Sequence, residues 1–163
     1  MKKGFTLIEI LVVIVIIGIL SVIVTTNFVG ARERAQDSQK KSNLNQLKIA
    51  LRSYYAQHKA FPGSTNGLVI NGCGATGTSA CGDSFTEGNI EYLPKFAKSG
   101  NFYEFRYYQC TGGDDFRATV SLSNKSDPDV AESKLKCPTS SCAGTTLSYD
   151  GASDKITYVL CND

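Results

Sequence analysis

The first pattern in the chain is an almost unbroken apolar run over residues 5–24, interrupted by one acid, Glu9. As an α-helix, which rises about 1.5 Å per residue, this run is long enough to cross about 30 Å of hydrocarbon. A carboxylate in hydrocarbon costs about 2.5–3.5 kcal/mol on insertion scales, so Glu9 needs a partner. Lys2 and Lys3 precede the run and favour a cytoplasmic N-terminus.

A second pattern follows directly, because apolar residues recur at helical spacing over residues 31–58 and no proline interrupts them. They would form one stripe along an amphipathic helix: Leu44, Leu47, Leu51, Tyr54 and Tyr55. The sequence therefore predicts one long helix from residue 5 to about His58. Its first half is apolar all round, and its second half packs on a sheet.

Phe61-Pro62-Gly63 ends the helical pattern, since the residue before a proline avoids the α region. Residues 64–88 are rich in Gly, Ser, Thr and Asn, and a long surface loop is predicted over residues 61–100. Alternating apolar and polar residues then predict an antiparallel sheet over residues 102–161 with a hairpin loop at 111–115. Its four strands would lie at residues 103–108, 116–122, 147–149 and 156–160.

The resulting fold class is α+β: a long N-terminal α-helix whose C-terminal half packs on a four-stranded antiparallel β-sheet. Residues 31–163 would form the globular head. The chain has 163 residues and a net charge of +2, so bulk charge does not mark it as a nucleic-acid binder. Its six cysteines all follow Phe61, which indicates a head exported to an oxidising compartment.

The cysteines predict three disulfides, although six cysteines can pair in many ways. Cys73 and Cys81 lie within the predicted loop and are expected to pair with each other. A bond between Cys110 and Cys161 would join the ends of the first and last strands, and Cys137 and Cys142 flank a short segment that a local bond would close. The alternative of a cytosolic metal site fits poorly, because these spacings are not those of paired zinc knuckles.

Catalytic chemistry is not indicated. The one histidine, His58, falls at the expected end of the long helix, where it would interact with the helix dipole. No serine lies in a nucleophile elbow, and no glycine-rich phosphate loop follows a strand. The sequence therefore predicts a protein that is not an enzyme and needs no cofactor.

The motif Gly4-Phe5-Thr6-Leu7-Ile8-Glu9, followed by an aliphatic run, resembles the class III leader of type IV pilins and type II secretion pseudopilins. The resemblance covers roughly residues 1–35. It implies that a membrane prepilin peptidase cuts between Gly4 and Phe5 and methylates the new N-terminus of Phe5. Residues 1–4 would be the leader and residues 5–30 the transmembrane and polymerisation half of the helix. Glu9 would pair with the terminal amine of a neighbouring subunit during assembly.

Other interpretations of the N-terminus explain less. An ordinary secretory signal could end at Val29-Gly30-Ala31, and a plain anchor needs only the apolar run, but neither accounts for Gly4-Phe5 together with Glu9. Local melting of the helix during assembly is known in several pili of this family. Many relatives have a proline where this chain has Thr26, so the resemblance supports such melting less strongly for this chain. Gly18 either weakens the helix or permits close packing of helices.

The resemblance implies a structural subunit of a type IV pilus, a homopolymer built through N-terminal helices and serving adhesion, motility or DNA uptake. The alternative is a pseudopilin that pushes folded proteins out through a type II secretion system. A membrane-anchored head without a polymer role is disfavoured by the leader. Implied partners are the prepilin peptidase, the inner-membrane assembly platform, the ATPase motor and membrane lipid before assembly, with no nucleic-acid site evident. The protein would be a single-pass inner-membrane precursor and later a cell-surface filament.

Major pseudopilins of this family carry a calcium site, so the resemblance makes the acidic clusters of the chain candidate calcium ligands. Asp114-Asp115, Asp127-Pro128-Asp129 and the turn at 150–154 all lack EF-hand spacing. The turn at 150–154 is the best candidate among them, but an ordinary solvated turn is favoured.

Overall fold

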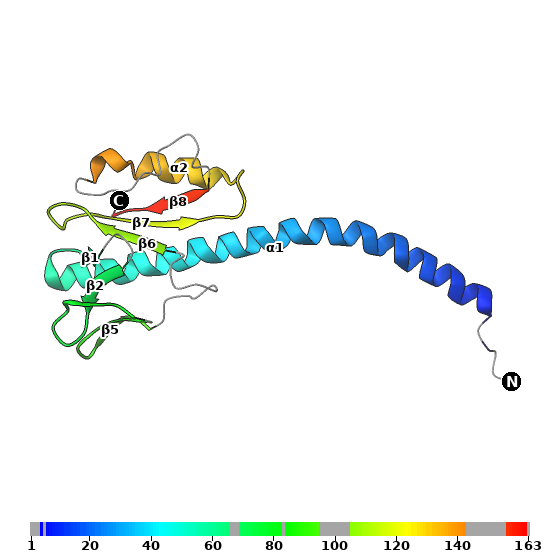
Figure 1. Cartoon of the computed structure of the whole chain (residues 1–163), viewed down its shortest axis with the longest axis horizontal. Helices are drawn as coiled ribbons and strands as arrows, with labels where there is room; N and C mark the ends of the chain where they lie inside the picture. Colours follow the sequence, from blue (N-terminus) through cyan, green and yellow to red (C-terminus); the bar gives the residue numbers. More distant parts are fainter. Residues whose placement is uncertain are drawn as a thin grey trace. The chain divides into compact units, whose positions relative to one another are not determined.

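The computed structural model describes residues 4, 6–65, 69–82, 84–94, 105–142 and 156–162, without the side chains of 22–29. The chain divides into two compact units, Met1–Gln36 and Asp37–Asp163. A long helix is followed by antiparallel sheets (Figure 1), so the predicted α+β class is confirmed.

Helix α1 spans Leu7–His58 and ends where the sequence predicts. Lys59 follows with a left-handed φ of 58°, and its backbone N–H donates to the carbonyl of Tyr55 at 2.8 Å. That bond satisfies one of the carbonyls that the end of a helix leaves without a partner.

The predicted apolar stripe of α1 forms the centre of the head. Leu44, Leu47, Leu51 and Tyr54 are buried, and Tyr55 packs against them while half-buried. The stripe belongs to the same core cluster as Phe116 on the sheet. Burial of this face stabilises the C-terminal half of α1 by the hydrophobic effect.

The main sheet has the antiparallel order β6-β7-β8, formed by Phe105–Gln109, Phe116–Ser121 and Thr157–Leu160. The strands predicted at 103–108, 116–122 and 156–160 correspond to these three. The fourth strand, expected at 147–149, lies outside the described residues.

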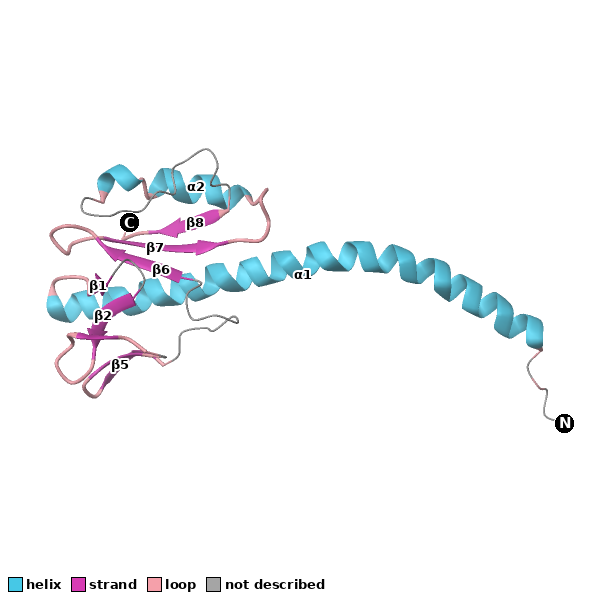
Figure 2. Ribbon diagram, viewed as in Figure 1, coloured by secondary structure: helices cyan, strands magenta, loops and turns pink. Residues whose placement is uncertain are grey.

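Strand β7 is covered on both faces, which the alternating pattern did not predict. Phe116, Ala118 and Val120 are buried as expected, but Arg117 and Thr119 are buried as well. This face is covered by helix α2, Pro128–Lys136, which packs along β8 on the opposite side of the sheet from α1 (Figure 2), and by the following segment, which binds Arg117 through Pro138 and Ser141.

The prediction of a plain loop over residues 61–100 is wrong. The described part of this stretch contains five short strands: β1 (Gly63–Thr65), β2 (Val69–Cys73), β3 (Ser79–Ala80), β4 (Phe85–Glu87) and β5 (Ile90–Leu93). They pair as a three-stranded sheet, β1-β2-β3, and a two-stranded sheet, β4-β5. Apolar side chains from them, such as Ile70 and Phe85, enter the core, so burial stabilises strands too short to show a periodic signal.

Helix α2 was not predicted either, because its first residues were taken for an acidic cluster. Asp127 is its N-cap and accepts a hydrogen bond from the backbone N–H of Asp129 at 3.0 Å. Pro128 occupies the first turn, where a missing N–H costs nothing.

Two of the three predicted disulfides are wrong. The bond between Cys73 and Cys81 is present, but Cys110 pairs with Cys142 and Cys137 with Cys161. The predicted pairs, Cys110–Cys161 and Cys137–Cys142, assumed that residues 137–142 form a simple local loop. In the structure Cys137 ends α2 beside β8, and the 3-10 turn Thr139–Ser141 carries Cys142 to the end of β6.

Candidate assembly site

The predicted site begins at the N-terminus of α1, where Thr6 and Glu9 cap the helix together. The backbone N–H and the hydroxyl of Thr6 both donate to Oε2 of Glu9, each at 2.9 Å. The backbone N–H of Glu9 donates to Oγ1 of Thr6 at 3.4 Å. This reciprocal arrangement is a capping box, and the sequence contained its Thr-x-x-Glu signature.

The capping box does not involve Phe5, which lies outside the described residues. A cut between Gly4 and Phe5 would therefore leave it intact. Pairing of Glu9 with the amino group of a processed Phe5 stays a prediction.

Helix α1 presents apolar side chains to its surroundings over its first turns. Within the described part of the Met1–Gln36 unit, large apolar side chains are between 48% exposed, at Val12, and 84% exposed, at Leu7. Such a surface is stable only when lipid or other protein covers it. Counting only residues with described side chains, no helix is both long enough and apolar enough to span a membrane.

Gly4 and Gly18, two of the glycines of the N-terminal unit, are not required by packing within the described part of the chain. A Cβ added at Gly4 or Gly18 would meet no described heavy atom within 4 Å. Any need for a small side chain at these positions would come from contacts with another molecule.

In the head, Lys41 joins α1 to the start of α2. Its Nζ lies 2.6 Å from Oδ2 of Asp127 and 2.7 Å from Oδ2 of Asp129, and 5.7 Å from the centre of the Tyr158 ring. Partial burial acts to lower the pKa of Lys41, but the hydrogen bonds and charges of the two carboxylates outweigh it and raise the pKa. This cluster ties α1 to the N-terminus of α2.

His58 joins the end of α1 to the β4-β5 sheet. Its Nε2 lies 2.7 Å from Oε2 of Glu87, the same oxygen that accepts a hydrogen bond from the hydroxyl of Tyr92 at 3.0 Å. The ring of Tyr54 stacks on the imidazole with 4.1 Å between centroids. Desolvation and the bond to Glu87 raise the pKa of Tyr92 to about 12. The cluster holds two elements together.

Arg117 organises the segment that carries Cys137 and Cys142. Its Nη1 donates to Oδ2 of Asp115 at 2.6 Å, and its Nη2 donates to Oγ of Ser141. The guanidinium is almost fully buried beneath this segment, and its Nε has no hydrogen-bond partner among the described residues.

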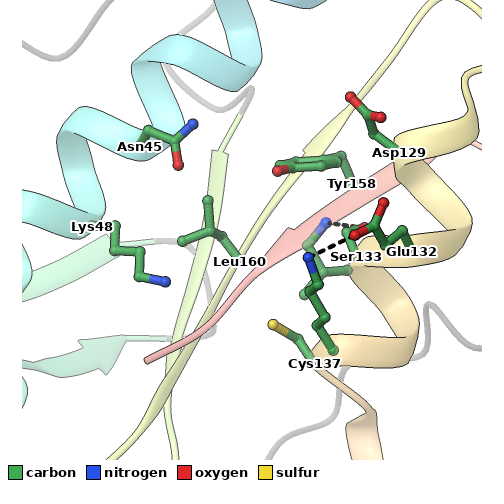
Figure 3. Close-up of a pocket in the computed structure, with 10 residues that line it drawn as sticks. Asn45, Lys48, Asp129, Glu132, Ser133, Cys137, Tyr158 and Leu160 are labelled. Atoms are coloured by element: carbon green, nitrogen blue, oxygen red, sulfur yellow. Dashed lines mark hydrogen bonds and ion pairs between the residues drawn. The ribbon is translucent and has the colours of Figure 1, made fainter. Parts of the chain in front are cut away.

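A polar cavity of about 250 Å³ lies between α1, α2 and β8 (Figure 3). Asn45 and Lys48 line it from α1, and Tyr158 lines it from β8. The polar groups of α2 at this cavity are bonded: Glu132 accepts from Lys136 at 2.6 Å, and Ser133 accepts from the backbone N–H of Val159 at 3.2 Å. The cavity therefore presents polar groups already satisfied by the fold.

No group of three or more His, Cys, Asp or Glu side chains in the described ranges is placed to hold a metal ion. The candidate calcium turn at 150–154 lies outside those ranges.

Comparison with known proteins gives the N-terminal motif a name. Residues 1–25 match the family described as "Prokaryotic N-terminal methylation motif". Over 67 residues, 41% of the chain, the sequence is 39% identical to "Type II secretion system core protein G" of Pectobacterium carotovorum subsp. carotovorum, covering 43% of that protein. Identity to the Escherichia coli (strain K12) protein of that name is 40% over 67 residues, covering 46% of it.

A type IV pilin is also similar to the chain. The chain is 37% identical over 65 residues to "Type IV major pilin protein PilA" of Myxococcus xanthus (strain DK1622), covering 30% of that protein. The chain thus spans less than half the length of each of these relatives. No solved structure matches significantly. Proteins of these two kinds are structural subunits and not enzymes. The methylation motif, these relatives and the α+β architecture support the resemblance of the chain to type IV pilins and type II secretion pseudopilins.

Proposed function

We propose that the chain is a structural subunit of a type IV pilus. A prepilin peptidase cuts between Gly4 and Phe5 and methylates Phe5, and the product polymerises through its N-terminal helix. The observation that carries this proposal is a capped glutamate, Glu9, at the start of a helix whose apolar side chains are exposed all along residues 7–20.

The exposed apolar surface requires cover in both stages of this scheme. As a precursor the helix lies in the inner membrane, with Lys2 and Lys3 on the cytoplasmic side. In the filament the corresponding helices of other copies replace the lipid. Small residues such as Gly18 allow helices to approach closely there, consistent with the open space around that position.

Glu9 keeps an acceptor for a second subunit. Both donors of Thr6 end on Oε2, so among the described contacts Oε1 remains available. The α-amino group of a processed Phe5 on a neighbouring copy supplies a cation of the right charge. Burial of an unpaired carboxylate among helices is costly, so this pairing favours insertion of each subunit in register.

A surface pilus accounts for the covalently tied head. Three disulfides fix the described head, which suits a protein exposed outside the cell to adhesion or traction forces. A secretion pseudopilin is the second candidate, favoured by relatives named type II secretion system core protein G. Both candidates imply an assembly platform and an ATPase motor in the inner membrane.

Electron microscopy of cells with and without the gene, combined with mass spectrometry of sheared filaments, tests the proposal. We expect surface filaments only when the gene is present, made of subunits that begin at a methylated Phe5. The secretion alternative would be established if the filaments were short and periplasmic and if cells without the gene lost protein export. Polymerised protein that retains Met1 would overturn both.

A further inference from the structure

We propose a contact between heads that supplements the polymerisation of the N-terminal helices. The turn at the start of β5, with Ile90 and Glu91, inserts into a hollow on α2 of the next copy. Ala131, Lys134, Leu135 and Pro138 line this hollow. The proposal rests on the proposed filament function and names the part of the head that meets the next subunit.

The hollow on α2 is a surface with no described cover. It has a volume of about 430 Å³, and Leu135, one of the residues that line it, is 83% exposed. The opposite face of α2 is already used, because Val130 and Ser133 are buried against the head. A leucine this exposed, beside an alanine and a proline, would gain stability from a neighbour that excludes water.

The β4-β5 hairpin offers a side chain of matching kind. Ile90 is the first residue of β5 and is 43% exposed, one of the few large apolar side chains exposed in the described head. The hairpin is held rigidly behind it, since Phe85 and Leu93 are buried and Glu87 is bonded to His58. A preordered apolar side chain loses little entropy on docking.

Charge selects this pairing of surfaces. Glu91 is exposed immediately beside Ile90, and Lys134 lines the hollow next to Leu135. When Ile90 of one copy lies in the hollow, Glu91 of that copy approaches Lys134 of the next copy at the rim of the contact. The other strongly exposed leucine or isoleucine in the described head, Ile49, is flanked by the basic residue Lys48 and would bring like charge to Lys134.

The positions of the two surfaces favour a chain of copies over a closed pair. Within the head, β5 and α2 lie on opposite sides, with α1 and the main sheet between them (Figure 1). A contact between two different patches on opposite sides is heterologous, and it repeats from copy to copy instead of closing into a dimer. This is the symmetry that a filament needs.

A charge swap in the full-length protein tests the contact. We expect Glu91→Lys and Lys134→Glu each to reduce the amount of shear-resistant filament roughly two- to fivefold, and the double variant to restore it. Asp114→Lys and Lys125→Glu serve as the matched control, because both residues are exposed in the head and neither lines the hollow nor belongs to β5. The control pair should show neither loss nor mutual rescue.

The apolar half of the contact is tested by Leu135→Ser, which should reduce filament recovery by about tenfold or more while leaving processing unchanged. A photoreactive amino acid at position 135 should give a ladder of covalent multimers whose cross-linked peptide contains Ile90. Normal filaments from every variant, or cross-links to another segment, would overturn the contact while leaving the filament function in place. A wild-type chain that forms no filaments would overturn both.

Discussion

Replacing Glu9 by glutamine separates two roles that the structure allows for this residue. In the first, Glu9 is a helix cap that accepts two hydrogen bonds from Thr6. In the second, its negative charge pairs with the α-amino group of a neighbouring subunit. Glutamine at this position of a capping box still accepts the Thr6 bonds, but it carries no charge.

The magnitudes of the two roles differ enough to decide between them. Loss of a helix cap costs about 1 kcal/mol, a change of about fivefold in the population of the first helical turn. A charge pair about 4 Å apart at an effective dielectric constant of about 20 contributes about 4 kcal/mol, or roughly a thousandfold in the affinity of one subunit for the next. Only the second loss is large enough to abolish assembly.

We therefore expect Glu9→Gln to be inserted and processed at Phe5 yet to form almost no filaments. Thr6→Ala is the matched control, since it removes the cap and keeps the charge, and it should reduce assembly only severalfold. The assay is immunoblotting of sheared filaments against the processed pool in the membrane fraction. Abundant filaments from Glu9→Gln, with few from Thr6→Ala, would refute the charge pairing and leave Glu9 as a cap.

Two further predictions concern the stability of the head. Lys41→Met should lower the free energy of unfolding by about 1–3 kcal/mol, because Asp127 and Asp129 lose their shared cation. Thermal melting measures this loss, with Lys125→Met as the control. Equal melting temperatures for the two variants would contradict the prediction. At high pH the head should unfold progressively. The pKa of Tyr92 is raised from 10.0 to about 12, so its contribution is complete below pH 10 and is lost as the pH rises toward 12. Tyr92→Phe should retain more of its circular dichroism signal in that window, and an unchanged alkaline transition would argue against this assignment.

The parts of the fold that the sequence predicted are those with long periodic patterns. The stripe from Leu44 to Tyr54 extends over several helical turns, so burial and periodicity agree there. The alternation along β7 located the strand, although both of its faces are buried. The two small sheets of residues 63–93 have strands of two to five residues. Strands this short are stabilised by side chains such as Phe85 in the core, which no local pattern encodes.

The candidate site divides in the same way. Gly4, Phe5 and Glu9 were predicted because a short contiguous motif carries them, and the Thr6 cap could have been found from the same residues. The burial of Arg117 was not predicted, because nothing in β7 itself indicates that α2 and the following segment cover that face. Contacts between segments distant in sequence, such as Arg117 with Ser141, are not encoded locally.

Arg117 also explains why the disulfide pairing could not be derived from spacing. Cys137 and Cys142 are near neighbours in sequence, and a local bond between them would close the smallest loop. The guanidinium of Arg117 binds Ser141 and the carbonyl of Pro138, which holds the segment between the two cysteines against β7. Cys142 then lies at Cys110 instead of Cys137.

Arg117→Met should therefore change the covalent structure as well as the stability. The substitution removes the hydrogen bonds of a buried guanidinium, including those to Asp115, Pro138 and Ser141, at a cost of about 3 kcal/mol, and releases the segment to form the local Cys137–Cys142 bond. Non-reducing peptide mapping should recover that peptide from the variant and only the Cys110–Cys142 and Cys137–Cys161 peptides from the wild type. Arg106→Met is the control, since Arg106 is exposed on β6. If Arg117→Met destabilises the head yet keeps the native pairs, the pairing is set by α2 and β8 alone, and the role given to Arg117 is wrong.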